Sequence, residues 1–242
     1  MDVFVGTSRG MPLEEHFSSG ARAAFWTKGG AHLSSLSDMA LKLLRDNQHL
    51  YRDVQHLHPN IVYFIGGLPD ITSKINDHRY QEIIYNEATH ETYHRVTNII
   101  RTISHTIIQA NAIPCFATIT PMSLEQWNNT RLNKGYTSYL LHHHQYEDMN
   151  HLLNSAIINI NNFILDLNNL NNVDTPKFAS CIIKKRGQGR DHRIMFSRLH
   201  DGCHPTEAII KKWKTELEDV MSSNRYRNAT EAGLIAARGN TP

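Results

Sequence analysis

The chain of 242 residues has few cysteines, no long apolar run and almost no excess of charge. Its three cysteines, Cys115, Cys181 and Cys203, are widely spaced and form no C-x-x-C pair, which argues against a disulfide framework and a structural zinc site. No signal-peptide pattern follows Met1, so we expect an intracellular protein with reduced cysteines. No run approaches the length of a membrane span.

The positive and negative charges of the chain are nearly balanced. The net charge is +2, and hydrophobic and charged residues make up 40% and 20% of the chain, as in an ordinary soluble globular domain. Composition alone therefore indicates neither a nucleic-acid nor a membrane partner. We expect one domain over residues 1–221, followed by a flexible polar tail over 222–242. The oligomeric state has no signal in the sequence.

Apolar runs typical of strands alternate with helical patterns along the chain. The expected strands cover 2–6, 21–27, 61–65, 113–119 and 178–183, and the expected helices cover 12–19, 33–57, 81–110, 149–167 and 207–220. This alternation predicts an α/β fold: a single-domain, flavodoxin-like α/β/α sandwich with a central, mostly parallel five-stranded sheet. The polar stretch 122–146 is expected to be a loop. The many asparagines of the helix over 149–167 point to no function.

An acid three residues before a histidine, Asp201-Gly202-Cys203-His204, is the first candidate for chemistry. His204 would serve as a general base, and Asp201 would orient its ring. Taken alone, the motif is equally typical of a turn that starts a helix. A nucleophile is available in Ser8, which follows the first expected strand. Because the carboxyl ends of parallel strands share one edge of a sheet, we expect Ser8, the two residues Gly29-Gly30 and the stretch 67–70 to meet there.

Four short blocks in this order resemble the SGNH/GDSL-type serine hydrolases over roughly residues 2–221. The blocks are Gly6-Thr7-Ser8, the glycine pair Gly29-Gly30, Gly67-Leu68-Pro69-Asp70, and Asp201 to His204. The resemblance implies that Ser8 is the nucleophile of a triad with His204 and Asp201. It also implies an oxyanion hole formed by backbone N–H groups of Ser8 and of Gly29 or Gly30. The implied substrate is a small ester or an acetylated compound, and no cofactor is expected.

Two positions depart from the family pattern. Thr7 replaces the aspartate of the first block, and Pro69 replaces an asparagine whose side chain donates to the oxyanion. Proline has no donor in its side chain or its backbone. Loss of one oxyanion donor typically lowers the rate by about 10²–10³. The residues therefore leave two interpretations open, a working esterase or deacetylase and a catalytically silent SGNH-like binding module.

The binding interpretation has its own candidate surface. A basic stretch over 184–193 would contact phosphates of a nucleic acid through five side chains, Lys184, Lys185, Arg186, Arg190 and Arg193. In the Oskar family, a domain that resembles the SGNH hydrolases binds RNA. A solvated loop is the usual form of such a stretch.

The sequence His90-Glu91-Thr92-Tyr93-His94 matches the H-E-x-x-H pattern of zinc proteases. No third ligand follows at a suitable spacing, and the next residue, Arg95, is charged. We therefore interpret these residues as a polar helix face and predict no metal site. The run His142-His143-His144 is interpreted as part of a solvated loop, and Cys203 as a small buried residue.

Overall fold

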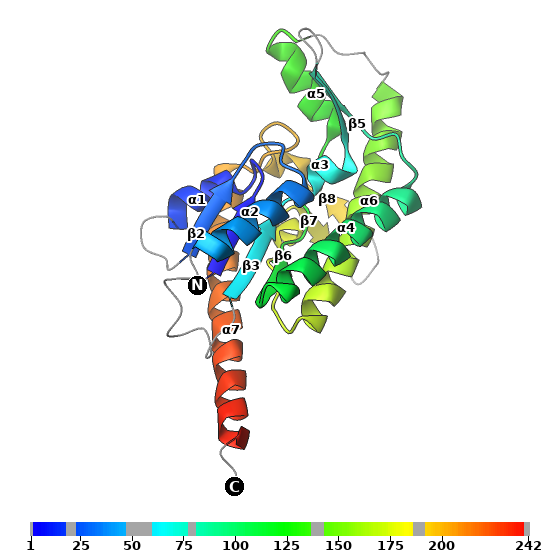
Figure 1. The fold of residues 1–242 in the computed structure, drawn as a ribbon. Helices are drawn as coiled ribbons and strands as arrows, with labels where there is room; N and C mark the ends of the chain where they lie inside the picture. The colour runs from blue at the N-terminus through cyan, green and yellow to red at the C-terminus, as the bar shows by residue number, and fades with distance from the viewer. Residues whose placement is uncertain are drawn as a thin grey trace.

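The computed structural model describes residues 2–17, 23–46, 60–76, 81–136, 143–185 and 192–239 (Figure 1). Its centre is a sheet of four parallel strands in the order β2-β1-β3-β6. The strands are β1 (Asp2–Gly6), β2 (Ala23–Thr27), β3 (Asn60–Ile65) and β6 (Ala112–Phe116). Four of the predicted strands are thus confirmed, in the parallel arrangement expected.

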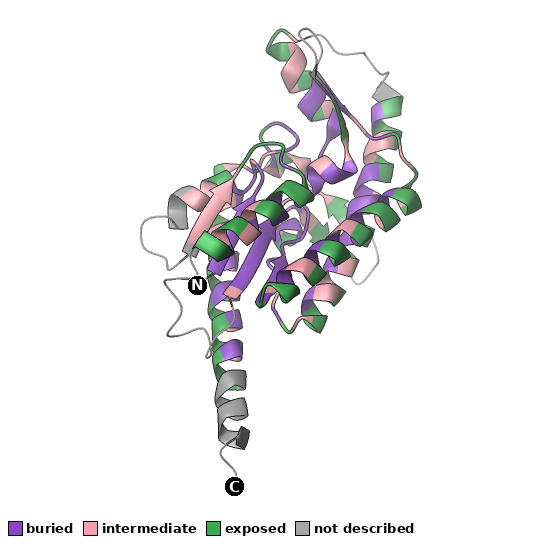
Figure 2. Cartoon of the chain, viewed as in Figure 1, coloured by how far each residue is buried: buried purple, intermediate pink, exposed green. Residues whose placement is uncertain are grey.

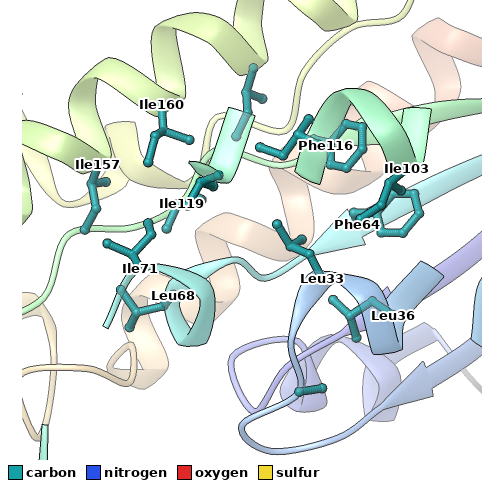
Figure 3. Packing of buried hydrophobic residues seen from close by; sticks show 14 of the residues in the cluster. Leu33, Leu36, Phe64, Leu68, Ile71, Ile103, Phe116, Ile119, Ile157 and Ile160 are labelled. Carbon is teal, nitrogen blue, oxygen red and sulfur yellow. The ribbon is translucent and has the colours of Figure 1, made fainter. Parts of the chain in front are cut away.

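The sheet is covered on both faces, because its strands are apolar on both sides. Helices α2 (Leu33–Asp46), α4 (Thr89–Gln109) and α6 (His143–Leu170) pack on one face through a core that includes Leu36, Phe64 and Ile160 (Figure 3). Helices α1 (Met11–Phe17) and α7 (Glu207–Gly239) close the other face through a second core. Figure 2 shows strand β3 as buried and the edge strand β2 as partly buried. The predicted α/β/α sandwich is therefore confirmed.

The predicted fifth strand over 178–183 is not found. Phe178–Cys181 form a 3₁₀ helix (η2), and only Ile183–Lys185 (β7) are extended, paired with His192–Ile194 (β8) in a separate two-stranded sheet. Phe178 instead stacks on Trp213 of α7, with ring centroids 4.7 Å apart. The apolar character that suggested a strand serves this contact.

At Pro114 and Phe116, the outer edge of β6 is occupied by side chains rather than by a further strand. Pro114 has no N–H, and its carbonyl oxygen accepts from Asn171 Nδ2 at 3.3 Å. Two residues on, the N–H and the carbonyl of Phe116 are both bonded to the side chain of Asn168. Since alternate residues of a strand face the same neighbour, side chains from the end of α6 occupy the place of a fifth strand.

The asparagines of α6 form a regular set of contacts with the chain that follows β6. Asn161 accepts from the Ile119 N–H at 2.7 Å and donates to the Ile119 carbonyl at 2.8 Å. Asn154 bonds Met122 in the same way, at 3.2 and 3.1 Å, and Asn150 accepts from the N–H of Leu124 at 2.7 Å. Together with Asn168 they form what we term the asparagine ladder, which consists of Asn150, Asn154, Asn161 and Asn168.

Simple geometry explains the spacing of the asparagine ladder. From Asn161 to Asn168, seven residues of helix rise about 10.5 Å. Their partners Ile119 and Phe116 are three residues apart, and three extended residues span about 10 Å. The chain after β6 has no neighbouring strand at these positions. Its buried N–H and carbonyl groups instead form hydrogen bonds with the asparagine side chains of α6. The asparagine content that had no interpretation in the sequence has this structural role.

Two segments, one before α4 and one after β6, form a small projection at one end of the sheet (Figure 1). It contains α3 (Leu68–Ile71), the antiparallel hairpin of β4 (Ser73–Asn76) and β5 (Gln81–Ile84), and α5 (Leu124–Asn133). Asn128 of α5 brackets Ile83 of β5 with two 2.9 Å hydrogen bonds, which join the helix to the hairpin. We call this unit the cap.

Three predicted boundaries are corrected by these elements. Residues 81–84 form a strand, so the helix expected from 81 begins at Thr89. The stretch 122–146, expected to be a loop, contains α5 and the first residues of α6. The helix expected to end near Val220 continues to Gly239. The predicted helix over 33–57 is seen as α2, and its part over 47–57 lies outside the described residues.

Helix α7 is anchored beyond the predicted boundary at 221. Asn224 is buried, accepts from the Asp174 N–H at 2.6 Å and donates to the hydroxyl of Tyr63 at 3.2 Å. Arg225 forms an ion pair with the buried Asp2 of β1 at 2.7 Å. Burial nevertheless raises the pKa of the Asp2 carboxyl. Among the helices in the described ranges, none is long and apolar enough to cross a membrane.

Candidate active site

Ser8 lies in a tight turn directly after β1, at the carboxyl end of the sheet. The turn is held by the N–H of Thr7, which donates to the Ile65 carbonyl at 2.9 Å, and by the N–H of Gly10, which donates to the Thr7 carbonyl at 2.8 Å. The side chain of Thr7 is buried beneath the turn, whereas Ser8 is half-buried. Helix α1 begins at once, so the serine is presented between a strand and a helix.

The second part of the site is a closed loop before α7. Leu199 and Pro205 form an isolated β-bridge, and the N–H of His200 donates to the His204 carbonyl at 2.9 Å. Inside the loop, Asp201 Oδ1 accepts from the N–H groups of Cys203 at 2.9 Å and His204 at 2.7 Å. This aspartate-centred turn is a local consequence of the sequence. It leaves Oδ2 free to meet the imidazole.

The three side chains that the sequence singled out are connected in a line. His204 Nδ1 lies 2.7 Å from Asp201 Oδ2, and His204 Nε2 lies 3.1 Å from Ser8 Oγ. Burial by itself raises the pKa of Asp201, but the hydrogen bonds from the ring and backbone of His204 and from the Cys203 N–H outweigh it and hold that pKa well below its usual range. Asp201 is therefore ionised near neutral pH and fixes the Nδ1–H tautomer of His204.

Gly202 joins the histidine loop to the cap. Its φ is +77°, and a Cβ placed on it would lie 2.6 Å from Gln126 Cβ and 2.7 Å from the Ser123 carbonyl oxygen. The N–H of Ser123, the N-cap of α5, donates to the Gly202 carbonyl at 2.8 Å. No other residue type fits this conformation and this close approach. The start of α5 therefore positions the Asp201–His204 pair.

The predicted oxyanion donors lie around Ser8. A Cβ placed on Gly29 would be 3.8 Å from Ser8 Cβ, and both Gly29 and Gly30 line the same cleft as the serine. The backbone N–H groups of Ser8, Gly29 and Gly30 have no acceptor among the described residues. Exposed donors without an internal partner are what an oxyanion hole requires.

The third block is built around a buried carboxylate. Asp70 Oδ2 accepts from the Leu33 N–H at 3.0 Å, and Oδ1 lies 3.3 Å from Nδ1 of the exposed His32. Burial raises the pKa of Asp70, although these contacts oppose the shift. Pro69 lines the cleft but offers no donor there. Asp70 therefore fixes the segment after Gly30, while the position of the family's third donor is filled by a proline.

A cleft of about 720 Å³ lies over Ser8 and His204. One wall is the sheet edge with the serine turn and the glycine pair, and the other belongs to the cap, which contributes Ile83, Trp127 and Arg131. Ligand pockets commonly have volumes of about 300–1,000 Å³. The cleft is large enough for a small organic substrate.

Sequence reasoning missed two contributors to this site. Arg9, next to the serine, is buried and donates through Nη1 to the Thr120 carbonyl at 2.8 Å and through Nη2 to Cys203 Sγ at 3.5 Å. It thus ties the serine turn to the histidine loop and to the segment after β6. Its position beside Ser8 was the available signal. Arg131 escaped notice because α5 was expected to be a loop.

The fold of the chain is similar to that of solved structures of hydrolases. A candidate acylhydrolase of Bacteroides fragilis matches over 94% of this chain and 87% of its own, with a TM-score of 0.54 and 14% identity. A GDSL-like lipase of Bacteroides thetaiotaomicron matches over 96% and 88%, with a TM-score of 0.50 and 15% identity. The chain has the SGNH/GDSL hydrolase fold. No protein-family profile matches the sequence, and no curated protein matches it significantly.

The residues of the H-E-x-x-H pattern do not belong to a cluster of potential metal ligands among the described residues. His90, Glu91 and His94 are exposed on α4. Among the described residues, the group of three potential ligands close enough to share a cation is His200, Asp201 and His204, two of which belong to the line from Ser8. His142 and the side chains of the two histidines that follow lie outside the described part of the chain.

The basic stretch is described only in part. Lys184 of β7 pairs in register with Arg193 of β8, and both are exposed. Lys185 lies in β7, and its side chain, together with residues 186–191, falls outside the description. Nucleic-acid binding by this stretch stays a prediction.

Proposed function

We propose that the chain is a serine ester hydrolase. The observation that carries the proposal is the unbroken line Ser8 Oγ, His204 Nε2 and Nδ1, Asp201 Oδ2, with heavy-atom distances of 3.1 and 2.7 Å. Both distances lie in the range through which a nucleophile, a base and its orienting carboxylate act together. The cleft over the serine and the SGNH fold support the same conclusion.

In this mechanism, His204 accepts the proton of Ser8 as Oγ forms a bond to the ester carbonyl carbon. The negative charge on the carbonyl oxygen is met by the N–H groups of Ser8 and the glycine pair. The tetrahedral intermediate expels the alcohol, which receives the proton from His204, and leaves an acyl-serine. Water then adds with His204 again as base, the carboxylic acid departs, and Ser8 regains its proton.

The direct test is hydrolysis of 4-nitrophenyl acetate by the full chain and by Ser8→Ala. We expect turnover that falls to background in the variant, because no other described side chain next to His204 replaces the nucleophile. Ser34→Ala, which changes an exposed serine at the start of α2, is the matched control and should leave turnover unchanged. Equal activity of wild type and Ser8→Ala would contradict the proposal.

A fluorophosphonate probe tests the serine without a substrate. It should label Ser8 stoichiometrically, since the probe reacts with serines activated by a neighbouring base. His204→Gln, which removes the base, should abolish labelling. The silent binding module predicts no labelling of either protein.

A further inference from the structure

The cap wall of the cleft is cationic. The cleft is lined by Arg9, Lys74 and Arg131, together with His32 and His204, and no aspartate or glutamate is among its described lining residues. Arg9 is buried and both of its terminal guanidinium nitrogens donate to internal acceptors, although its Nε has none. Lys74 of β4 and Arg131 of α5 are therefore the permanent charges that a ligand would meet.

Neither of these two cations has a counter-ion among the described residues. Three arginines elsewhere in the described chain are paired, Arg95 with Glu87, Arg225 with Asp2, and Arg227 with Asp174. Neither Lys74 nor Arg131 has an ion pair or a side-chain hydrogen bond with any described residue. The Nε atom of Arg131 is buried and lacks an acceptor. A half-buried guanidinium without an acceptor is a ready site for an anion.

Arg131 is also held in place before any ligand arrives. Its guanidinium carbon lies 4.4 Å from the centre of the Trp127 ring, and Trp127 is buried in the cleft wall. Asn128, one residue further on, fixes α5 to β5, the strand that pairs with the strand of Lys74. Both charges therefore belong to one rigid unit, which faces the serine across the cleft. A fixed charge loses little conformational entropy when it binds.

We propose that the substrate is an ester that carries a negatively charged oxyacid group, a carboxylate or a phosphate, which Arg131 and Lys74 bind while the ester carbonyl lies at Ser8. This inference rests on the proposed function. It adds the substrate class: neutral acyl esters lack the group that the cap recognises. Trp127 and Ile83 line the same cleft and would cover an apolar linker.

Binding is tested first, in the full-length Ser8→Ala variant, so that hydrolysis does not matter. The probes are glutaranilic acid, an amide with a free carboxylate, its neutral counterpart valeranilide, and phenyl phosphate as the phosphate probe. By calorimetry we expect an anionic probe to bind at least about tenfold more tightly than valeranilide, as one charge-assisted interaction allows. Raising the ionic strength should reduce this difference. Which anion binds more tightly distinguishes a carboxylate from a phosphate.

Three further variants locate the effect. Arg131→Met keeps an apolar stem over Trp127, and Lys74→Gln keeps length; each should reduce the preference for the anionic probe, and together they should abolish it. Lys134→Gln removes an exposed charge at the end of the same helix outside the cleft, and should leave the preference unchanged. Unchanged melting temperatures would show that the variants are folded. Equal affinity for charged and neutral probes, or a preference that survives the double change, overturns the inference.

Kinetics separate this inference from the proposed function. With Ser8 intact, kcat/KM for mono-4-nitrophenyl glutarate should exceed that for 4-nitrophenyl valerate by about tenfold; Arg131→Met should reduce the difference, and Arg131→Met with Lys74→Gln should remove it. Equal hydrolysis of both esters would overturn the anionic substrate class while supporting the hydrolase. Selective binding of glutaranilic acid with no hydrolysis of either ester would overturn the hydrolase and support the anion-binding wall.

Discussion

The side-chain amide of Asn161 bonds both the N–H and the carbonyl of Ile119, at 2.7 and 2.8 Å. Each group is buried, and a residue that has left the sheet thereby keeps the hydrogen bonds of a strand. The next residue, Thr120, accepts the Arg9 guanidinium that holds the serine turn. This contact of α6 is thus linked, through Thr120 and Arg9, to the turn that holds Ser8.

Asn161→Leu should lower the free energy of unfolding by roughly 3 kcal/mol, because it leaves a buried N–H and a buried carbonyl without partners. Urea unfolding followed by far-ultraviolet circular dichroism measures the change. Asn162→Leu alters an exposed side chain of the same helix and should change stability by less than about 0.5 kcal/mol. Equal effects of the two changes would mean that the ladder contributes nothing specific.

Asp201→Asn should lower kcat by about 10⁴, the effect known for the equivalent change in serine proteases, because the amide no longer holds the Nδ1–H tautomer. The amide oxygen still accepts from the two backbone N–H groups of the loop, so the fold should remain. Steady-state hydrolysis and a melting curve separate the two effects. A variant that retains full kcat would remove Asp201 from the triad.

Gly202→Ala should destabilise the protein by several kcal/mol and abolish activity, because the added methyl group clashes with the start of α5. Gly135→Ala is the matched control: its φ is +83°, yet nothing lies within 4 Å of the added atom. It shares only the backbone strain of about 1 kcal/mol. The excess loss in Gly202→Ala measures the contact between the histidine loop and the cap.

Pro69→Asn should raise kcat for 4-nitrophenyl acetate at least tenfold, since it returns a side-chain donor to a position where one donor is worth about 10²–10³ in rate. KM should change little, because the donor acts on charge that develops in the transition state. Pro69→Ala controls for loss of the proline ring alone. An increase in both variants would assign the effect to backbone freedom instead.

The two site carboxylates should affect stability with opposite dependence on pH. The pKa of Asp70 is raised in the folded protein. Its contribution to the free energy of unfolding is therefore fully present below the unfolded-state pKa of about 4, and it is lost as the pH rises through the folded-state pKa. The lowered pKa of Asp201 means that its contribution is present above about 4 and is lost on acidification. Wild-type stability minus that of Asp70→Asn should therefore fall as the pH rises above about 4. The difference for Asp201→Asn should fall from pH 5 downwards, and parallel curves would contradict both assignments.

Much of the fold and of the candidate site could be predicted from residues whose effect on structure is local. Continuous apolar runs such as Ile61–Ile65 specify central parallel strands, and Asp201 organises its own turn. The short run 178–183 misled, because burial against Trp213 and burial in a sheet leave the same apolar pattern. The cap was missed because α5 is polar on most of its surface, and its place depends on Asn128 meeting a strand far away in sequence.

The asparagine ladder was beyond local reasoning for a related reason. Asparagine is a weak helix former. The seven-residue spacing of Asn154, Asn161 and Asn168 gains a meaning only when their extended partners, three residues apart, are known. A polar residue at every seventh position of an otherwise apolar helix face was nevertheless visible in the sequence. It is a signal to look for an extended segment without a strand partner.

The ladder also sets an order of events in folding. Phe116, Ile119, Met122 and Leu124 precede α6 in the chain, yet the backbone groups through which they bond the ladder are satisfied only after α6 has formed and docked. Until then these groups have no partner except water, and Thr120, next to Ile119, is not held in position to receive Arg9. The line from Ser8 through His204 to Asp201 should therefore be completed late, after the sheet and α6 are together, although Ser8 precedes both helix and ladder in the chain.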